Sequence, residues 1–300
     1  MEFKQLRSFV SVVKYQSFTK AAEKTFISQP TISTHVRALE EELKTQLIIR
    51  NTKNIELTQK GWELYETAKS IINLEDKLIR KWTDETLNII HVGASSIPSA
   101  YLLPQMIPAF MQLHPETRFN ITQSDSANIL DGLSSGLYDV GIVGMTSGDE
   151  TISCTPFCQD RMVLVTPNNE KFRKLSESEV FPLELLSREP LILREDGSAS
   201  GKCAERILEE MGIPSDGANI CASLNDLESI KNLVAAGLGI SVISDRAVAD
   251  EVASGRILQF ALNGESRRDF YVAVRKSAPP AAVVQRFIAF VKELYQYGQE

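Results

Sequence analysis

The sequence has few of the residues that build metal, redox or catalytic centres. Its 300 residues include 4 cysteines and 3 histidines, and no Cys-x-x-Cys pair occurs, which excludes a zinc ribbon or a thioredoxin-like centre. We expect buried, reduced thiols, and redox sensing stays open for Cys154 and Cys158 because they are close in sequence. No uninterrupted apolar run approaches the roughly 18 residues of a membrane span. Because no secretory signal precedes the first charged residues, we expect a cytoplasmic protein without a membrane partner.

Catalytic motifs are equally scarce. His35, His91 and His114 stand in no triad or Glu-x-x-His context. Residues 197–203 resemble a phosphate-binding loop, but the first glycine is one position too close to the Gly-Lys pair, and Cys203 replaces the metal-binding Ser or Thr. We therefore expect no enzyme, no cofactor and no metal ion.

The composition fits a soluble globular protein of about two domains, with 43% apolar and 24% charged residues. The net charge of -7 is unevenly distributed. Residues 1–61 hold ten basic and six acidic side chains, whereas residues 87–300 hold eighteen and twenty-seven. A basic amino-terminal region joined to an acidic remainder suits a protein that binds a polyanion through the amino-terminal region alone.

The first 43 residues predict a helix-turn-helix. Apolar residues at i, i+3, i+4 and i+7 over 6–13 indicate a first helix. Ser17 is a candidate N-cap of a second helix, after which Phe26 and Ile27 would form a buried turn. Ser28 is a candidate N-cap of a third helix. The apolar stripe of that third helix consists of Ile32, Val36, Leu39 and Leu43.

The opposite side of this third helix carries short hydrogen-bonding side chains and one guanidinium, concentrated in the first two turns. Such groups read base edges and bind phosphates when a helix amino terminus enters the major groove. A solvated polar face is the alternative for an isolated helix, but the tight turn and the local positive charge favour DNA binding. The predicted DNA-binding residues of this helix are Gln29, Pro30, Thr31, Ser33, Thr34 and Arg37.

Residues 46–58 predict a hairpin wing, because two apolar patches flank a polar, basic tip. We expect Arg50 and Lys53 at this tip to contact phosphates or a minor groove. Thr58 is a candidate cap of a long helix over 59–86, whose apolar stripe is wider than one seam. We interpret this helix as a dimerisation helix, with an ordinary intradomain helix as the alternative.

Four short motifs stand out in residues 1–61. They are Ala21-Ala22, Ser28-Gln29-Pro30-Thr31-Ile32-Ser33, Leu39-Glu40 and Leu57-Thr58-Gln59-Lys60-Gly61. With these motifs, residues 1–61 resemble the winged helix-turn-helix of LysR-type transcriptional regulators, and the resemblance extends over the whole chain. Lys44 and Ile48 depart from the family, which usually has Gly and Phe there, and these two departures put the local turn geometry in question. The family uses the segment that follows as a paired linker helix.

From residue 87 strands alternate with helices, which predicts α/β architecture with largely parallel sheets. The resemblance implies a two-lobed effector-binding domain built like a periplasmic solute-binding protein. We expect a winged helix-turn-helix over 1–58, a linker helix over 59–86 and the effector domain over 87–300. Lobe I would comprise 87–162 and 268–300, and lobe II 163–267, with crossing strands near 161–166 and 264–271. The final helix would pack on lobe I.

Serines gather at three strand-to-helix junctions of this region, where ligands bind in α/β proteins. Serine hydroxyls at helix amino termini form anion sites, although each run alone is also a common N-cap. In the family, residues matching Ser95, Ser126 and the Ser198 region touch the effector. We expect a small anionic metabolite as effector. The predicted effector-binding residues are Ser95, Ser96, Ser126, Thr146, Ser198, Ser200 and Asn225.

Residues 93–104 are similar to the sulfur-assimilation branch of the family, the CysL- and CysB-like regulators. This likeness implies sulfate, thiosulfate or an acylated serine as effector. The sequence thus predicts a regulator that binds an interrupted palindrome of double-stranded DNA as a dimer or tetramer, with RNA polymerase as a further partner. A small-molecule-binding protein without DNA readout is the alternative function.

Overall fold

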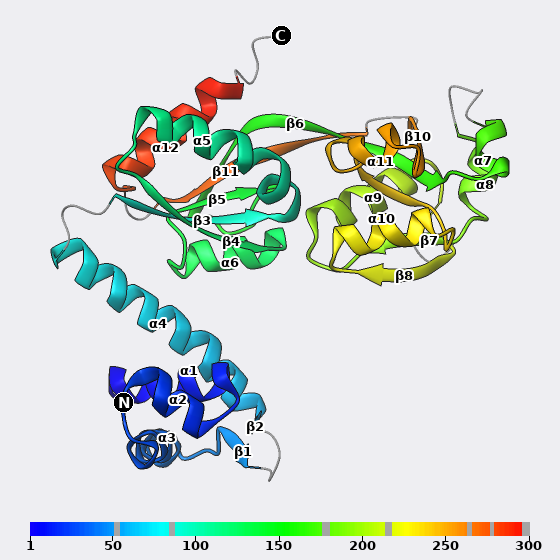
Figure 1. The fold of residues 1–300 in the computed structure, drawn as a ribbon. Coiled ribbons are helices and arrows are strands. Elements are labelled where there is room, and N and C mark those ends of the chain that lie inside the picture. Colours follow the sequence, from blue (N-terminus) through cyan, green and yellow to red (C-terminus); the bar gives the residue numbers. More distant parts are fainter. Residues whose placement is uncertain are drawn as a thin grey trace. The chain divides into compact units, whose positions relative to one another are not determined.

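The computed structural model describes residues 1–50, 55–83, 88–175, 181–213, 218–262, 266–276 and 279–295. It forms two compact units, one built from Met1–Thr86 and the other from most of the remaining chain (Figure 1). Across these described ranges, no helix is both long and apolar enough to cross a membrane. Each unit is described by itself below.

The first unit is a winged helix-turn-helix followed by a long helix. Apolar side chains from all of its helices and from β1 share one core, which includes Phe9, Ile32, Leu39, Ile48 and Ala68. Strands β1 and β2 pair antiparallel as the base of the wing. The elements are α1 (Phe3–Tyr15), α2 (Phe18–Thr25), α3 (Gln29–Leu43), β1 (Ile48–Arg50), β2 (Ile55–Leu57) and α4 (Gln59–Thr83).

The predicted serine and threonine caps of this unit are present. Ser17 Oγ accepts a hydrogen bond from Lys20 N at 3.2 Å and Ser28 Oγ one from Thr31 N at 3.3 Å. Thr58 Oγ1 accepts one from Gly61 N at 2.9 Å. Each cap satisfies an amide that the first helical turn leaves without a partner, so α2, α3 and α4 begin close to where the sequence predicts.

Contacts around the wing explain several residues of the family motif. Glu40 Oε1 accepts hydrogen bonds from Leu47 N at 2.9 Å and Ile48 N at 3.2 Å, which attaches the wing to α3. A Cβ atom on Gly61 would lie 2.2 Å from the Leu47 carbonyl oxygen, so only glycine fits there. Lys44 ends α3 with φ 50° in the left-handed region, which explains why glycine suits this position.

The prediction of a buried turn at Phe26 and Ile27 is wrong. Phe26 is 95% exposed and Ile27 is also exposed. Phe26 ends α2 with φ 57°, and this left-handed residue reverses the chain and leaves its side chain outside the core. Leu43, predicted for the buried stripe of α3, is exposed as well, because it lies in the last turn beyond the contact with α1.

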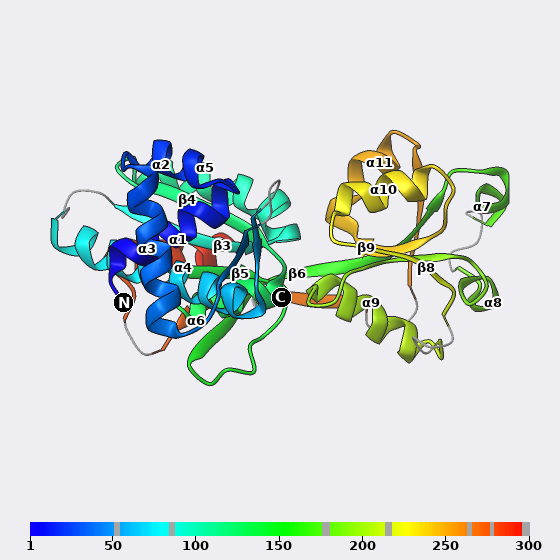
Figure 2. The same cartoon turned by 90° about the horizontal axis from the view of Figure 1, so that it is seen from below.

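The second unit consists of two lobes. In lobe I, β3 pairs parallel with β4 and with β5, and helices cover this sheet. In lobe II, β7 pairs parallel with β8, and Figure 2 shows α9 on one side of the lobe II strands with α10 and α11 on the other. Lobe I contains β3 (Ile89–Ser95), the π-helix η1 (Pro98–Leu102), α5 (Leu103–Leu113), β4 (Arg118–Ser124), α6 (Ser126–Ser134), β5 (Val140–Val143) and α12 (Ala282–Tyr295). Lobe II contains α7 (Glu170–Leu175), α8 (Leu183–Leu186), β7 (Leu191–Arg194), α9 (Ala199–Glu210), β8 (Ile220–Leu224), α10 (Leu227–Ala235), β9 (Ser241–Ser244), η3 (Asp245–Ala247), α11 (Ala249–Ala253) and β10 (Ile257–Phe260).

Two long strands, β6 (Ile152–Pro167) and β11 (Arg267–Arg275), connect the lobes (Figure 1). They pair antiparallel from Ile152 with Arg275 to Arg161 with Arg267. β11 also pairs antiparallel with β5, and β6 with β9 and β10. The expectation of largely parallel sheets is therefore wrong for the sheet that contains the crossing strands, which is mixed. The expected lobe boundaries at 162/163 and 267/268 fall within β6 and at the start of β11, and they stay a prediction.

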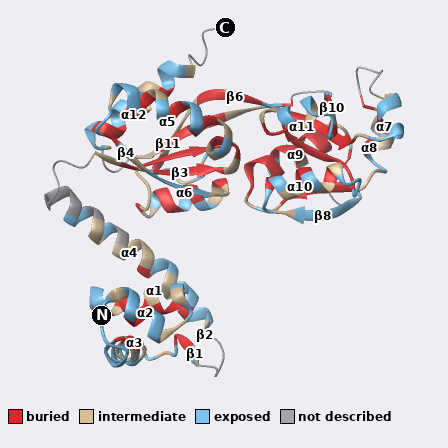
Figure 3. Ribbon diagram, in the orientation of Figure 1, coloured by how far each residue is buried: buried red, intermediate tan, exposed pale blue. Residues whose placement is uncertain are grey.

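The final helix packs on lobe I, as expected. The Phe287 ring of α12 lies 5.2 Å from the rings of Phe110 and Phe119, measured between centroids. These aromatic contacts belong to one buried core with β3, β5 and the crossing strands. Figure 3 shows β3, β5 and β6 largely buried and much of β11 at intermediate exposure. The helix thus returns the chain to the lobe in which the second unit begins.

The cysteines only partly match the prediction of buried thiols. Cys158 and Cys203 are buried, Cys154 is half-buried and Cys221 is exposed. All four are free thiols. Cys154 and Cys158 lie four residues apart on β6, roughly 13 Å along an extended strand, so they cannot form a disulfide with each other.

Candidate DNA-contacting and effector-binding sites

The polar side chains predicted to contact DNA lie on the surface of α3. Gln29, Pro30, Thr31, Thr34 and Arg37 are exposed, and Ser33 is half-buried. The opposite side of α3, formed by Ile32, Val36 and Leu39, is buried in the core. The amphipathic pattern therefore presents one polar surface at the amino-terminal half of the helix.

Hydrogen bonds within α3 hold these side chains in place. Gln29 Nε2 donates to Ser33 Oγ at 3.0 Å, and Thr34 Oγ1 donates to the Pro30 carbonyl at 2.9 Å. Arg37 Nε donates to Glu41 Oε1 at 2.8 Å, but the Arg37 side chain is 77% exposed. An exposed ion pair of this kind contributes little stability, so DNA can replace Glu41 as the partner of Arg37 at a small cost in free energy.

The two predicted wing contacts are less well defined. Arg50 ends β1, but its side chain is not among those described, and Lys53 lies outside the described residues. The sequence did not suggest a further contact of α3: Ser8 Oγ of α1 lies 2.7 Å from His35 Nδ1. This polar contact beside the core orients α3 against α1, and only a spatial arrangement reveals it.

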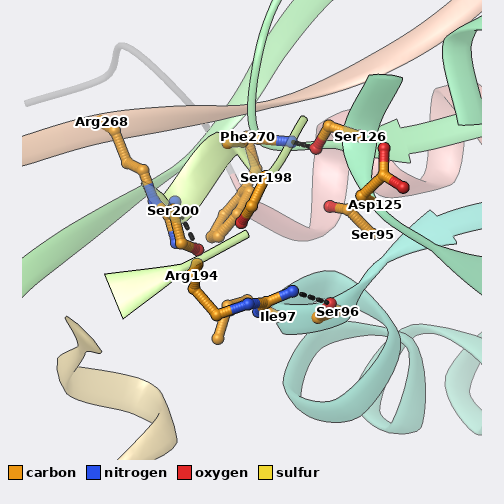
Figure 4. A pocket seen from close by; sticks show the side chains of 12 residues that line it. Ser95, Ser96, Ile97, Asp125, Ser126, Arg194, Ser198, Ser200, Arg268 and Phe270 are labelled. Atoms are coloured by element: carbon orange, nitrogen blue, oxygen red, sulfur yellow. Dashed lines mark hydrogen bonds between the residues drawn. The ribbon is translucent and has the colours of Figure 1, made fainter. Parts of the chain in front are cut away.

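A pocket lies between the two lobes of the second unit (Figure 4). Five of the seven predicted effector-binding residues line it, whereas Thr146 and Asn225 are not among the described residues of the lining. These serines come from the end of β3 and the amino termini of α6 and α9. The lining consists of Ser95, Ser96, Ile97, Asp125, Ser126, Gly144, Arg194, Ser198, Ala199, Ser200, Arg268 and Phe270.

Several of these serine hydroxyls accept a hydrogen bond from the protein. Ser96 Oγ accepts from Arg194 Nη2 at 3.3 Å, Ser200 Oγ from Arg268 Nη1 at 2.9 Å, and Ser126 Oγ from Gly144 N at 3.4 Å. A hydroxyl that accepts in this way can still donate its own hydrogen. The pocket can therefore direct several O–H donors at a ligand.

The N-cap interpretation and the ligand interpretation both apply to Ser198. Its hydroxyl oxygen accepts a hydrogen bond from Gly201 N at 3.3 Å and so caps α9. The same side chain lines the pocket. The amino terminus of a 12-residue helix adds a partial positive charge there, which favours an anionic group.

Two arginines that sequence reasoning missed line the pocket. Arg194 at the end of β7 is 5% exposed, and its Nε and Nη2 each donate to the Glu195 carboxylate at 2.9 Å. Arg268 of β11 is 7% exposed, and its Nε donates to Asp160 Oδ2 at 2.8 Å. Arg194 ends the apolar run of β7, whereas Arg268 lies between Arg267 and Asp269, so the local sequence does not mark both arginines as buried.

The described part of the chain contains no group of three or more His, Cys, Asp or Glu side chains that could hold a metal ion. His35 lies in α3, His91 in β3 and His114 at the end of α5, as the sequence predicts. The pocket between the lobes thus offers hydroxyl and guanidinium donors for binding a ligand.

Family models match almost the entire chain. "Bacterial regulatory helix-turn-helix protein, lysR family" matches residues 3–62, and "LysR substrate binding domain" matches residues 84–296. An HTH-type transcriptional regulator of Methanocaldococcus jannaschii is 31% identical over 242 residues, 80% of each chain. The Porphyra purpurea protein named "Probable RuBisCO transcriptional regulator" is 30% identical over 84% of this chain and 80% of its own length.

The HTH-type transcriptional regulator CysL of Bacillus subtilis is 27% identical over 248 residues, 81% of each chain, which is consistent with the sulfur-assimilation branch. Full-length CbnR in complex with its target DNA has the same fold, with a TM-score of 0.72 at 22% identity over 98% of this chain and 99% of that one. The winged helix-turn-helix and the two-lobed domain agree with these matches, and the chain therefore belongs to the LysR-type family of DNA-binding transcriptional regulators.

Proposed function

We propose that this regulator reads an interrupted palindromic operator with α3 of paired chains, under the control of a small anionic metabolite held between the lobes of the second unit. The observation that carries the effector part is the gathering of serine hydroxyls and two guanidinium groups around one pocket. These groups come from three separate strand-to-helix junctions and a crossing strand, so the fold has to bring them together.

The DNA-reading part of the proposal rests on the surface of α3. Gln29 and Arg37 have the side chains that form bidentate contacts with adenine and guanine edges. Thr31, Ser33 and Thr34 supply short donors and acceptors for phosphates or bases. Ser28 caps the amino terminus of α3 and is exposed. The exposed amino terminus of a helix favours binding of a phosphate.

Pairing of chains is supported by the exposed apolar residues of α4. Leu74, Leu78 and Ile79 are large hydrophobic side chains on the surface of this 25-residue helix. A second copy of the helix would cover such a stripe. Two chains joined in this way would present two α3 helices to half-sites of one operator, spaced by one helical turn of DNA or a multiple of it.

Control by the effector follows from the position of the pocket. The pocket has about 10 Å³ of free volume in this arrangement, room for roughly one water molecule. On this proposal, the lobes move relative to each other to admit a larger ligand. β6 and β11 are the strands about which such movement would occur. A ligand that prefers one lobe arrangement would shift the paired chains toward it, and thereby change DNA bending and access for RNA polymerase.

We further propose that the effector is a sulfur-related metabolite such as sulfate, thiosulfate or an acylated serine. Each of these carries an oxyanion or carboxylate that serine hydroxyls and arginines can bind. The likeness to CysL supports this branch, but the pocket chemistry alone suits many anions. The effector therefore has to be found by a binding screen.

A thermal-shift screen of the full-length protein tests the effector site, since a selective ligand raises apparent stability by mass action. The compounds are sulfate, thiosulfate, acylated serines and small carboxylates. We expect a shift that is lost in Ser198→Ala and Ser200→Ala but kept in Ser254→Ala, whose exposed hydroxyl bonds to its own helix outside the pocket. Equal shifts in all three variants would remove the serines from the site.

A further inference from the structure

Asp125 brings a negative charge into the proposed effector pocket. Among the described residues that line the pocket, Asp125 is the acidic one, and it directly follows β4 in lobe I. Figure 4 shows it beside Ser95 and Ser126, with Arg194 and Arg268 on the opposite side of the pocket. A carboxylate in this place opposes the binding of a simple anion.

The hydrogen bonds of Asp125 leave its charge in place. Oδ1 accepts from Asn128 N at 2.9 Å, and Oδ2 accepts from Asn128 Nδ2. Both donors are neutral, and the amino terminus of α6, which Asp125 caps, supplies only a partial positive charge. A carboxylate offers about four acceptor sites, and a ligand can use those that remain.

Gly197 keeps the carboxylate open on the lobe II side. A Cβ atom on Gly197 would lie 3.3 Å from Asp125 Oδ1, and the residue has φ +85°, which side chains rarely adopt. A larger residue would therefore both strain the backbone and crowd the carboxylate. Lobe II thus approaches Asp125 closely through a glycine, and Asp125 lines the pocket beside this contact.

The charges around the pocket do not add up to an excess of positive charge. The Arg194 guanidinium is paired with Glu195, and that of Arg268 with Asp160. Asp160 also pairs with Arg246, whose Nε lies 3.6 Å from Oδ1, so these three arginines balance Glu195, Asp160 and Asp125. Among the described residues Asp125 itself forms no ion pair. An anion without a cationic group would leave an excess of negative charge, whereas a neutral molecule with both charges would not.

We infer that the effector is zwitterionic, with an ammonium group at Asp125 and an anionic group at the serine hydroxyls and the two arginines. This inference rests on the proposed effector site and narrows its ligand class. It favours α-amino acids and derivatives with a free amine over inorganic oxyanions and N-acylated compounds. Of the sulfur-related effectors proposed above it therefore retains a serine acylated on oxygen and excludes sulfate and thiosulfate.

The test uses the full-length protein and ligand pairs that differ in one charge. Glycine, alanine, serine and cysteine are each compared with their N-acetyl derivatives, alongside sulfate and acetate, by thermal shift and calorimetry. The variant is Asp125→Asn, which can still accept the Asn128 N–H and so cap α6. The control is Asp226→Asn, which removes the charge of an N-cap aspartate at α10 outside the pocket.

We expect at least one free amino acid to bind the wild type and the Asp226→Asn variant on the order of tenfold more tightly than its N-acetyl derivative. In Asp125→Asn this preference should vanish and sulfate or the N-acetyl compounds should bind more tightly. If Asp125→Asn leaves the order of affinities unchanged, or if sulfate binds the wild type better than every amino acid, the inference is wrong while the pocket remains an anion site. If no compound binds either protein, the proposed effector site fails and the inference fails with it.

Discussion

The buried ion pair between the crossing strands predicts a large loss of stability when one partner is removed. Asp160 of β6 is fully buried; its carboxylate accepts from Arg268 Nε at 2.8 Å and from Ser244 Oγ at 2.7 Å. Arg268→Met keeps most of the side-chain volume but removes the nearer cation from the buried Asp160 carboxylate. The more distant Arg246, whose Nε lies 3.6 Å from Asp160 Oδ1, then remains as its cationic partner among the described residues. Breaking a buried pair in this way costs about 3–5 kcal/mol.

The neighbouring Arg161 provides a matched control. Its Nε lies 3.3 Å from Asp245 Oδ2, but the Arg161 side chain is 54% exposed. A surface pair contributes about 0–1 kcal/mol, so Arg161→Met should have little effect on stability. The two variants make the same substitution and differ mainly in the burial of the pair.

Hydrogen exchange of the β6 and β11 amides measures the free energy of opening these strands. Arg268→Met should reduce their protection by roughly two to nearly four powers of ten, because each 1.4 kcal/mol corresponds to a factor of ten. Arg161→Met should change protection by less than about a factor of ten. Equal losses in the two variants would refute the argument that the buried pair stabilises the crossing strands.

Three further predictions concern DNA binding, the wing and pH. Arg37→Ala should weaken operator binding by about 1–3 kcal/mol in an anisotropy titration, and an unchanged affinity and site preference would exclude Arg37 from base readout. Gly61→Ala should destabilise the first unit in urea unfolding, because its Cβ would lie 2.2 Å from a backbone oxygen, whereas Gly148→Ala has open space and should be nearly neutral. Burial acts to raise the pKa of Glu251, but the hydrogen bond and charge of Lys231, a backbone hydrogen bond and the charge of Arg256 together outweigh burial and lower the pKa below its ordinary 4.5. A lowered pKa means that the ionised Glu251 stabilises the fold above pH 4.5 and that this stabilisation is lost in more acidic solution. Between about pH 5 and pH 3, the Tm of Glu251→Gln should therefore fall less than the Tm of the wild type.

The helices of the first unit could be predicted because their apolar spacing and their caps agree. Ser17, Ser28 and Thr58 mark helix starts, and each makes the expected hydrogen bond. Burial of Phe26 could not be predicted from its apolar character, because a left-handed helix end directs that side chain outward. Local sequence patterns therefore predict the position of a helix better than they predict whether a single side chain is buried.

The serines of the pocket could be predicted from the sequence, but its two arginines could not. Serines at strand-to-helix junctions have a local signature, so Ser95, Ser126 and Ser198 could be named from the sequence. Arg194 and Arg268 have no such signature, because their place in the pocket depends on pairing between distant strands and lobes. The extent of β6 and its antiparallel pairing with β11 escaped prediction for the same reason, since strand pairing is set by tertiary contacts.

Sequence-specific DNA binding through α3 is the central claim, and one comparison tests it most directly. DNA that binds the full-length protein is selected from a random library, and its affinity is then measured for the wild type and for Gln29→Ala and Ser33→Ala. The account predicts an interrupted palindrome among the selected sequences and a preference over random DNA that falls sharply in both variants. Selected DNA without a shared motif, or variants that keep the full preference, would contradict the account.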